Sequence, residues 1–258
     1  MVAAVAFRRE RRVPDHLSTV FFGLSDKDSF YRNFQAVLAS GITGNVFTGD
    51  NLFTFGKNLG FLSDEKFMAV FAEQATDAPE KATVWRAHTL CWAAGRALRL
   101  PGDFVECGSY RGTSARIIAG YLDFATVDKT FTLFDVFDDV GQIDQHGYPA
   151  MAGGIHEAVK ARFTDFPNVR AIKGYVPRIL EGNTPDAIAF LHVDMNNAAA
   201  ERAALEALFD LVSPGGSVVL DDYGWRTYAD QKREHDAFFE SRGYQVLELP
   251  TGQGLVIK

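Results

Sequence analysis

The sequence has 258 residues, 47% of them hydrophobic, which is enough for one large domain or for one domain with an appendage. Its formal net charge of −7 argues against nucleic acid or an anionic membrane as a partner. The two cysteines, Cys91 and Cys107, allow neither a disulfide framework nor a zinc-binding spacing, so a reducing cytoplasm is favoured. No apolar run approaches the ~20 residues of a membrane span, and we expect no signal peptide.

Helical patterns dominate the first hundred residues, and we interpret residues 1–100 as an N-terminal helical extension. Apolar spacing predicts a helix within residues 26–48 that ends at Gly41, another that opens at Ser63, and a third over residues 79–99. Between them, residues 44–62 are rich in glycine, asparagine and phenylalanine. We expect an irregular segment there, either a lid over a substrate or a packed structural loop.

From residue 101 onward, strands and helices alternate, which predicts a second domain over residues 101–258. The expected strands are 103–107, 130–135, 169–173, 188–194 and 217–222. The expected helices are 113–123, 154–163, 176–182, 199–212 and 228–241. The chain then ends in two short apolar strands around a Pro-Thr-Gly-Gln-Gly turn. The pattern indicates an α/β fold with a mostly parallel sheet and an antiparallel terminal hairpin.

A glycine turn follows the first of these strands. Glu106 lies near the strand's end, Gly108 and Gly112 form the turn, and Thr113 and Ser114 open a helix. Glycines let backbone N–H groups approach a ligand closely at a helix N-terminus. The spacing differs from the G-x-G-x-x-G of dinucleotide sites, and a carboxylate repels pyrophosphate. S-adenosylmethionine, with its ammonium, sulfonium and ribose, fits this turn better.

Strand after strand in this region ends on a carboxylate, at Glu106, Asp135, Asp194, Asp221 and Asp222. Carboxyl ends of parallel strands share one edge of a sheet, where ligands bind. Asp135 follows the glycine turn by ~20 residues, as the carboxylate for ribose hydroxyls does in nucleotide sites. Asp194, Asp221 and Asp222 would form a hard oxygen site suited to Mg²⁺ or another divalent cation. Arg226 or Lys232 could instead neutralise part of their charge. The polar stretch DDVGQIDQHGYPAMAGG after the second strand is long enough to reach a substrate.

Several stretches together carry a resemblance to one known family: GDFVECGSYRGTS, FDVFDD, RFTDFPNVRAIKGYVPRIL, IAFLHVDMNN, LFDLVSPGGSVVLDDYGW and LPTGQGLVIK. Through them, residues 102–258 resemble the class I S-adenosylmethionine-dependent methyltransferases of the macrocin O-methyltransferase (TylF-like) family. The resemblance implies a Rossmann-like class I methyltransferase sheet. It also implies methylation of hydroxyls on sugars of natural products, with a divalent cation held by three aspartates.

The resemblance assigns residues to a cofactor site and a metal site. The residues that would bind S-adenosylmethionine are Glu106, Cys107, Gly108, Tyr110, Gly112, Thr113, Ser114, Asp135, Phe137, Gly174, Tyr175, Val176 and Asp194. The residues that would hold Mg²⁺ are Asp194, Asp221 and Asp222.

The chain departs from the family pattern just after the first metal aspartate. Sugar-modifying members have D-G-D there, and the second aspartate is thought to be the general base, whereas this chain has Asp194, Met195 and Asn196. An amide is not a useful base at neutral pH. His192 precedes Asp194 by two positions, so both side chains leave the same face of the strand. His192 is therefore a candidate base or a partner that orients a metal ligand, with a plain core histidine as the alternative.

The sequence predicts a cytoplasmic, S-adenosylmethionine-dependent and Mg²⁺-assisted O-methyltransferase. Its acceptor would be a small hydroxylated molecule, a sugar or a glycan-linked natural product, and a homo-oligomer is left open. A non-catalytic S-adenosylmethionine-binding protein is the first alternative, suggested by Asn196. A nicotinamide-dependent oxidoreductase is the second, and the missing G-x-G-x-x-G and the terminal hairpin disfavour it.

Overall fold

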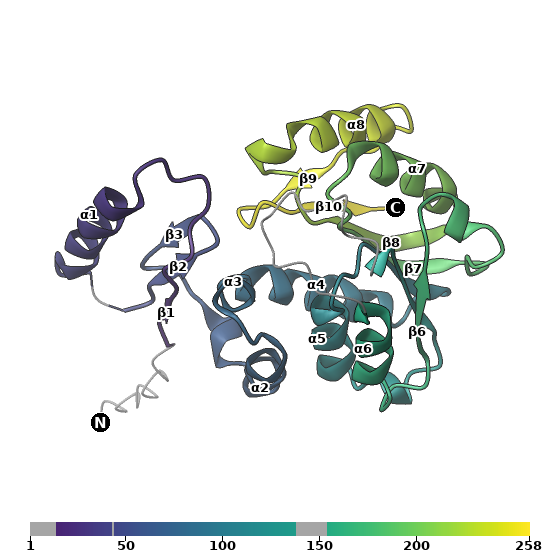
Figure 1. The fold of residues 1–258 in the computed structure, drawn as a ribbon, viewed down its shortest axis with the longest axis horizontal. Helices are drawn as coiled ribbons and strands as arrows, with labels where there is room; N and C mark the ends of the chain where they lie inside the picture. Colours follow the sequence, from purple (N-terminus) through teal and green to yellow (C-terminus); the bar gives the residue numbers. More distant parts are fainter. Residues whose placement is uncertain (1–13, 43, 138–153) are drawn as a thin grey trace, which may run out of the picture. The chain divides into compact units, whose positions relative to one another are not determined.

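The computed structural model describes residues 14–42, 44–137 and 154–258 (Figure 1). The chain divides into two compact units, one that ends at Val84 and one that runs from Trp85 to Lys258. Each unit has buried hydrophobic residues of its own. The polar stretch that follows the second predicted strand lies outside the described residues.

The first unit combines helices with a small three-stranded sheet. Its elements are β1 (His16–Leu17), α1 (Lys27–Ala39), β2 (Phe47–Gly49), β3 (Leu52–Thr54), the 3₁₀ turn η1 (Gly60–Ser63), α2 (Glu65–Gln74) and α3 (Ala78–Ala82). Aspartate side chains cap the first turns of α1 and α2, because Asp26 and Asp64 each accept a backbone hydrogen bond from three residues further on. The predicted helices near residues 27 and 65 are therefore confirmed.

The β2–β3 hairpin corrects the expectation of a wholly irregular segment at residues 44–62. Its two turn residues, Asp50 and Asn51, have φ angles of 52° and 57°. A two-residue hairpin of type I′ needs positive φ at both positions, and Asp and Asn tolerate that region better than most residues. The segment is thus a tight hairpin followed by a 3₁₀ turn.

The second unit contains a seven-stranded sheet in the order β6-β5-β4-β7-β8-β10-β9. Its strands are β4 (Asp103–Cys107), β5 (Phe131–Asp135), β6 (Val169–Lys173), β7 (Ile188–Val193), β8 (Val212–Leu220), β9 (Leu247–Glu248) and β10 (Gly254–Ile257). The first five run parallel, and β10 pairs antiparallel with both β8 and β9. The predicted mostly parallel α/β sheet with a terminal antiparallel hairpin is confirmed.

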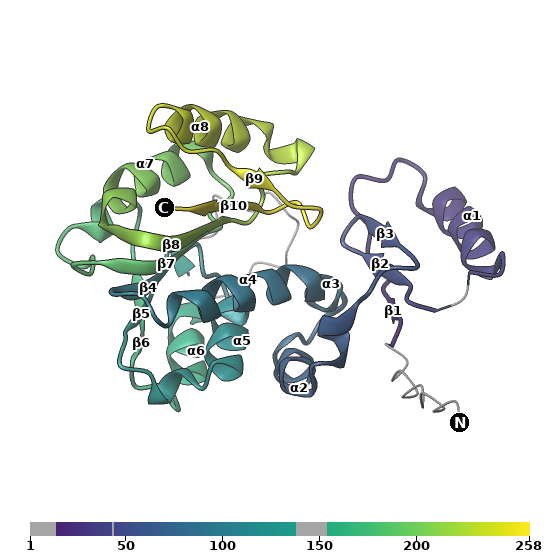
Figure 2. The same ribbon diagram turned by 180° about the vertical axis from the view of Figure 1, so that it is seen from behind.

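Helices cover both faces of this sheet, as the two opposite views agree (Figures 1 and 2). One face carries α4 (Val84–Ala97), α5 (Thr113–Tyr121) and α6 (Ile155–Arg162), and the other carries α7 (Ala198–Leu208) and α8 (Ala229–Glu240). Alternation along β4 sends Val105 and Cys107 into the core on the α7 and α8 side. Glu106, between them, consequently faces the side of α4 and α5.

Three further elements illustrate how the observed boundaries differ from the predicted ones. The helix expected over 79–99 is two helices, α3 and α4, separated at Thr83. The helix expected over 176–182 is only a 3₁₀ turn, Arg178–Leu180, in a segment bounded by Pro177 and Gly182. Strand β8 begins at Val212, before the expected 217, because its register to β7 shifts and accommodates the Pro-Gly-Gly stretch as an irregularity.

Among the described residues, no helix is long and apolar enough to cross a membrane.

Candidate functional site

Neighbouring parallel strands bring the predicted carboxylates to one edge of the sheet. Asp135 ends β5, Glu106 lies near the end of β4, Asp194 follows β7, and Asp221 and Asp222 follow β8. The backbone holds these ends level, because Asp194 N–H donates to Cys107 at 2.8 Å and Asp221 N–H donates to Val193 at 3.0 Å. The prediction that β7 and β8 are neighbours with adjoining ends is confirmed.

Glu106 and His192 form a buried pair across β4 and β7. They are register partners, so their side chains leave the same face of the sheet. His192 Nδ1 lies 2.7 Å from Glu106 Oε1, and the two side chains are 0% and 1% exposed. The other carboxylate oxygen, Glu106 Oε2, is buried with no hydrogen-bond partner among the described residues. A buried acceptor without a donor is costly, which indicates that a ligand donor belongs there.

Steric contacts require glycine at two positions of the turn after β4. A β-carbon at Gly108 would lie 1.8 Å from the carbonyl oxygen of Asp194. Gly112 has a φ of 72° at the N-cap of α5, and a β-carbon there would lie 2.9 Å from the Phe163 ring. Both positions therefore need glycine, and the turn leaves the N-terminus of α5 open to a ligand.

The side chain of Asp135 holds this turn by a hydrogen bond to its backbone. Its Oδ2 accepts from the backbone N–H of Tyr110 at 2.8 Å, and its Oδ1 accepts from the backbone N–H of Phe137. Gly174 N–H donates to the Asp135 carbonyl at 2.9 Å, which brings the segment after β6 beside the same residue. Burial raises the pKa of Asp135, while the two backbone donors oppose the rise. The predicted ribose carboxylate thus lies between the glycine turn and Gly174, another of the predicted cofactor residues.

The two aspartates after β8 contact a cation that the sequence analysis did not anticipate. Arg86 Nη1, on α4, lies 2.7 Å from Asp221 Oδ2 and 3.4 Å from Asp222 Oδ1. Lys232, one of the two predicted neutralising residues, instead pairs with Asp236 at 3.2 Å. Arg86 stood out in no motif, because its partners lie 135 and 136 positions later in the chain.

Asp221 accepts hydrogen bonds at both of its carboxylate oxygens. Its Oδ1 accepts from Gln253 Nε2 at 2.8 Å and lies 3.5 Å from His192 Nε2. Gln253 comes from the terminal hairpin and is itself held by the hydroxyl of Thr251. The LPTGQG stretch near the C-terminus therefore supports the site. The sequence resemblance included this stretch but assigned no role to it.

Burial and charge displace the pKa values of this group in opposite directions. Desolvation alone would raise the pKa of Asp221, but Arg86 and His192 hold it below its ordinary value. Burial, followed by the charge of Asp221, raises the pKa of Asp222 to about 7. Burial and the same neighbouring charges raise the pKa of Asp194 well above its ordinary value. Burial opposes a charge on His192, yet the acceptor carboxylates of Asp221 and Glu106 beside its ring nitrogens raise its pKa well above the ordinary value.

The donor set fits a divalent cation. His192, Asp194 and Asp221 each offer one ligand atom, and these atoms lie within 4.8 Å of one another. Carboxylate oxygens from two strand ends are the ligands that Mg²⁺ and Mn²⁺ favour. Of the predicted metal ligands, the structure thus groups Asp194 with Asp221, while Asp222 contacts Arg86.

A buried glutamate on α7 holds the loop after Asp194 in place by a hydrogen bond. Glu201, on α7, accepts from the backbone N–H of Met195 at 2.9 Å and from Gln231 Nε2 at 2.7 Å. Its other oxygen lies 2.9 Å from His235 Nε2. Asn196 follows in the left-handed region at a φ of 54°, with its Oδ1 buried and without a hydrogen-bond partner among the described residues.

The remaining predicted cofactor residues differ in what they expose. The Cys107 side chain is fully buried in the core, and burial raises its pKa. The Phe137 ring is also fully buried and stacks on His156. Thr113 and Ser114 open α5, where Thr113 Oγ1 accepts from Arg162. Tyr175 is 54% exposed, between the half-buried Gly174 and Val176.

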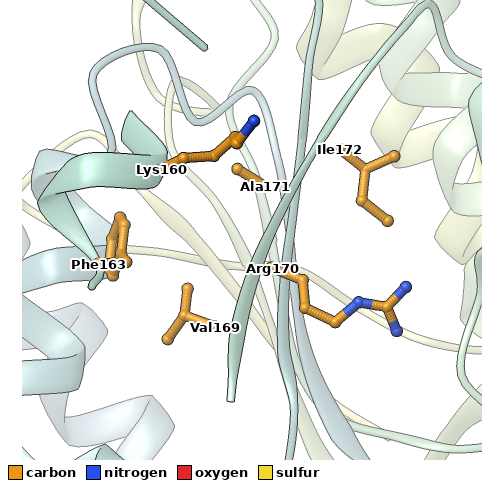
Figure 3. A pocket seen from close by; sticks show the side chains of 6 residues that line it. All are labelled: Lys160, Phe163, Val169, Arg170, Ala171 and Ile172. Atoms are coloured by element: carbon orange, nitrogen blue, oxygen red, sulfur yellow. The ribbon is translucent and has the colours of Figure 1, made fainter. Parts of the chain in front are cut away.

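A separate pocket of 430 Å³ lies beside the edge strand β6 (Figure 3). Lys160 and Phe163 line it together with Val169, Arg170, Ala171 and Ile172. Among the described residues, no carboxylate lines this pocket, and β6 is separated from β7 by two other strands. It therefore offers none of the groups that gather at the carboxyl edge of β4, β7 and β8.

Comparison of the sequence with known proteins agrees with this geometry. The profile of the family described as Macrocin-O-methyltransferase (TylF) matches residues 87–243, more than half of the chain. Demethyldecarbamoylnovobiocin O-methyltransferase of Streptomyces niveus is 27% identical over 140 residues, 48% of this chain and 53% of that protein. Mycinamicin III 3''-O-methyltransferase of Micromonospora griseorubida is 24% identical over 188 residues, 64% of this chain and 74% of that protein. The chain spans about half the length of the first curated relatives that it matches.

Solved structures of similar fold are methyltransferases. The O-methyltransferase NovP aligns with a TM-score of 0.59 at 21% identity, over 74% of this chain and 87% of that one. The calicheamicin methyltransferase CalS11 aligns with a TM-score of 0.57 at 16% identity, over 92% and 95%. These likenesses show a class I methyltransferase fold, as the sequence resemblance implied. By its profile match, the chain belongs to the macrocin O-methyltransferase (TylF) family.

Proposed function

We propose that the protein is an S-adenosylmethionine-dependent, Mg²⁺-assisted O-methyltransferase that acts on a small hydroxylated acceptor. One observation carries the proposal. Glu106, with a buried and unpartnered oxygen, directly precedes the glycine turn on one strand, and the two strands next to it in the sheet are followed by Asp194, Asp221 and Asp222. A cationic ligand fits the first group and a metal ion fits the second, and family membership favours the same pairing.

Glu106 and Asp135 are the residues that we assign to the cofactor. S-Adenosylmethionine, when bound, supplies the electrophilic methyl group. Glu106 Oε2 would accept a hydrogen bond from the ligand's ammonium, and Asp135 has lone pairs left beyond its two backbone bonds for ribose hydroxyls. Glycines 108 and 112 would keep the turn open for close approach of the ligand.

Asp194 and Asp221 are the residues that we assign to the metal, with Asp222 beside them. A bound Mg²⁺ would lower the pKa of an acceptor hydroxyl and orient it. Arg86 and His192 would compensate the remaining negative charge around Asp221. His192 is fully buried between Glu106 and Asp221, which favours a positioning role over a role as base.

The acceptor oxygen would attack the methyl carbon as the carbon–sulfur bond breaks, and the hydroxyl proton would pass to solvent water. The products are the methyl ether and S-adenosylhomocysteine. Asn196 supplies no base at the position where the sugar-modifying members carry an aspartate. The protein's main contribution would therefore be positioning and charge placement.

The acceptor class rests on the relatives. Their names describe methylation of a novobiocin precursor and of mycinamicin III, and a further solved relative is named as a TDP-rhamnose 3'-O-methyltransferase. These names support a sugar or sugar-bearing natural product as the acceptor. Cys91 and Cys107 are buried thiols, in keeping with the cytoplasmic location that we propose for such an enzyme.

Methyl transfer from labelled S-adenosylmethionine into a pool of sugar-bearing natural products would test the proposal. We expect transfer with Mg²⁺ and its loss in EDTA, with activity restored when Mg²⁺ is added in excess. Asp221→Asn should abolish transfer in both conditions while the circular dichroism spectrum stays unchanged. Full activity in EDTA would remove the metal from the mechanism. Cofactor binding without transfer to any acceptor would favour a non-catalytic binding protein.

A further inference from the structure

Arg86 lies against the carboxylates that we assign to the metal. It belongs to the first turn of α4, and its Nη1 is 2.7 Å from Asp221 Oδ2 and 3.4 Å from Asp222 Oδ1. The three side chains are only 13%, 12% and 11% exposed, so water screens their charges little. The guanidinium carbon also lies 4.9 Å from the Trp225 ring centroid, a cation–π contact. The guanidinium is therefore held in place by three side chains of one short segment, residues 221–225.

Both carboxylate oxygens of Asp221 already have contacts, which leaves few lone pairs for a metal ion. Its Oδ1 already accepts from Gln253 at 2.8 Å and faces His192 Nε2 at 3.5 Å. Its Oδ2 is the atom that contacts Arg86. A divalent ion that bound Oδ2 would lie close to the guanidinium, and two cations at one oxygen repel each other. Asp222, the other partner of Arg86, is also on the predicted list of metal ligands.

We propose that Arg86 competes with the divalent cation for Asp221 and Asp222 and thereby sets the metal affinity of the site. The inference rests on the proposed metal site. In the metal-free protein, Arg86 neutralises the carboxylate pair; when the metal binds, that salt bridge is given up or weakened. Arg86 is thus a positioning residue that makes metal binding weaker and more readily reversible than three free carboxylates would.

Direct measurement of Mn²⁺ binding tests this inference without any acceptor. Free Mn²⁺ would be followed by electron paramagnetic resonance at pH 8 in the wild type, Arg86→Gln and Arg86→Lys. A neighbouring opposite charge changes the proton affinity of a carboxylate by about 1–3 pKa units, so we expect Arg86→Gln to bind Mn²⁺ at least about tenfold more tightly. Arg86→Lys should fall between, because an ammonium lacks the forked geometry that spans two carboxylates.

Arg96→Gln is the matched control. Arg96 lies on the same helix, is exposed, and contacts Ser217 and Trp92 rather than the aspartates. Arg96→Gln removes one positive charge from α4, as Arg86→Gln does. Its Mn²⁺ affinity should nevertheless equal that of the wild type. Circular dichroism and binding of S-adenosylhomocysteine would verify that each variant is folded. Should Arg86→Gln fail to fold, Arg86→Lys against Arg96→Lys decides.

The outcomes separate the inference from the function on which it rests. Tighter Mn²⁺ binding by the Arg86 variants alone supports competition, even if the wild type binds too weakly to measure. Equal or weaker binding by the Arg86 variants than by the wild type overturns competition and leaves the metal site standing. Absence of Mn²⁺ binding in every variant, while S-adenosylhomocysteine still binds, overturns both the metal site and the competition.

Discussion

At Gly108, the absence of a side chain is what allows the ends of β4 and β7 to adjoin. A β-carbon would lie 1.8 Å from the Asp194 carbonyl oxygen, and the backbone φ is 94°. One residue thus fixes both the opening of the glycine turn and the place of the first predicted metal ligand. The sequence motif predicted a glycine for ligand approach; the structure adds that the glycine also accommodates the neighbouring strand.

Gly108→Ala should therefore destabilise the protein and weaken cofactor binding together. Overpacking and positive φ combine to an expected loss of about 3 kcal/mol in the free energy of unfolding. Gly182→Ala is the control, since Gly182 also has positive φ, at 72°, but its β-carbon would meet nothing within 4 Å. Gly182→Ala should lose only about 1 kcal/mol in the free energy of unfolding. Urea denaturation measures both, and equal losses in the two variants would contradict the steric account.

The sequence analysis predicted the site residues that lie in motifs. It missed those that come from distant parts of the chain. Glu106, Asp194 and Asp221 could be placed at one sheet edge because parallel strands end together. Arg86 and Gln253 could not, because each approaches Asp221 from a separate element, a helix before the sheet and the terminal hairpin. Which distant side chain reaches a carboxylate depends on tertiary packing, and no local spacing records it.

At the scale of elements, four of the parallel strands, β4, β5, β6 and β7, were the most predictable. Observed β6 coincides with its prediction, and β4 does too. The β2–β3 hairpin was missed because its turn is Asp50-Asn51, without the glycine that usually signals such a turn. The start of β8 was missed because Pro214 and the glycines after it indicate a turn, yet the strand continues through a register shift.

The small sheet of the first unit should respond to pH through His16. Its ring stacks on Phe47, with centroids 4.9 Å apart, and burial lowers the pKa of His16. A histidine whose pKa is lowered in the folded state binds its proton more readily when unfolded. The sheet is therefore fully stable above the unfolded pKa of about 6.5 and loses stability as the pH falls below it.

Hydrogen exchange of residues 47–54 at pH 5.5 and 7.5 measures this response. His16→Phe keeps an aromatic ring on Phe47 and removes the titration. Because intrinsic exchange varies with pH, the comparison is the ratio between variant and wild type at each pH. We expect the variant to be relatively better protected at pH 5.5 than at pH 7.5. A ratio that does not change with pH would exclude His16 as the titrating group.

At the scale of the whole molecule, the chain has one unit with a class I methyltransferase sheet and another, N-terminal unit of helices and a small sheet. The sequence analysis assigned residues 1–100 to an extension, and contact within the chain divides it after Val84. Apolar spacing predicted a helical N-terminal part, but only the fold shows that α4 belongs mostly with the large sheet. A lid role for residues 44–62 stays a prediction.

Hydrogen exchange with and without S-adenosylhomocysteine tests the lid. If residues 44–62 order over the cofactor, their amides should exchange more slowly when it is bound. Helix α1, Lys27–Ala39, belongs to the same unit and serves as an internal reference whose exchange should stay the same. Equal exchange of residues 44–62 in the two conditions would leave that segment as part of the scaffold.

Calorimetric titration with S-adenosylhomocysteine tests the central claim most directly, because it needs no acceptor. The wild type should bind one equivalent with a micromolar constant, about −8 kcal/mol. Asp135→Ala should weaken binding at least about tenfold, because the ribose hydroxyls lose a charged acceptor and the backbone N–H groups of Tyr110 and Phe137 lose theirs. Asp135→Asn, which keeps one oxygen, should fall between. Absence of binding in folded wild-type protein, or unchanged affinity in Asp135→Ala, would contradict the account.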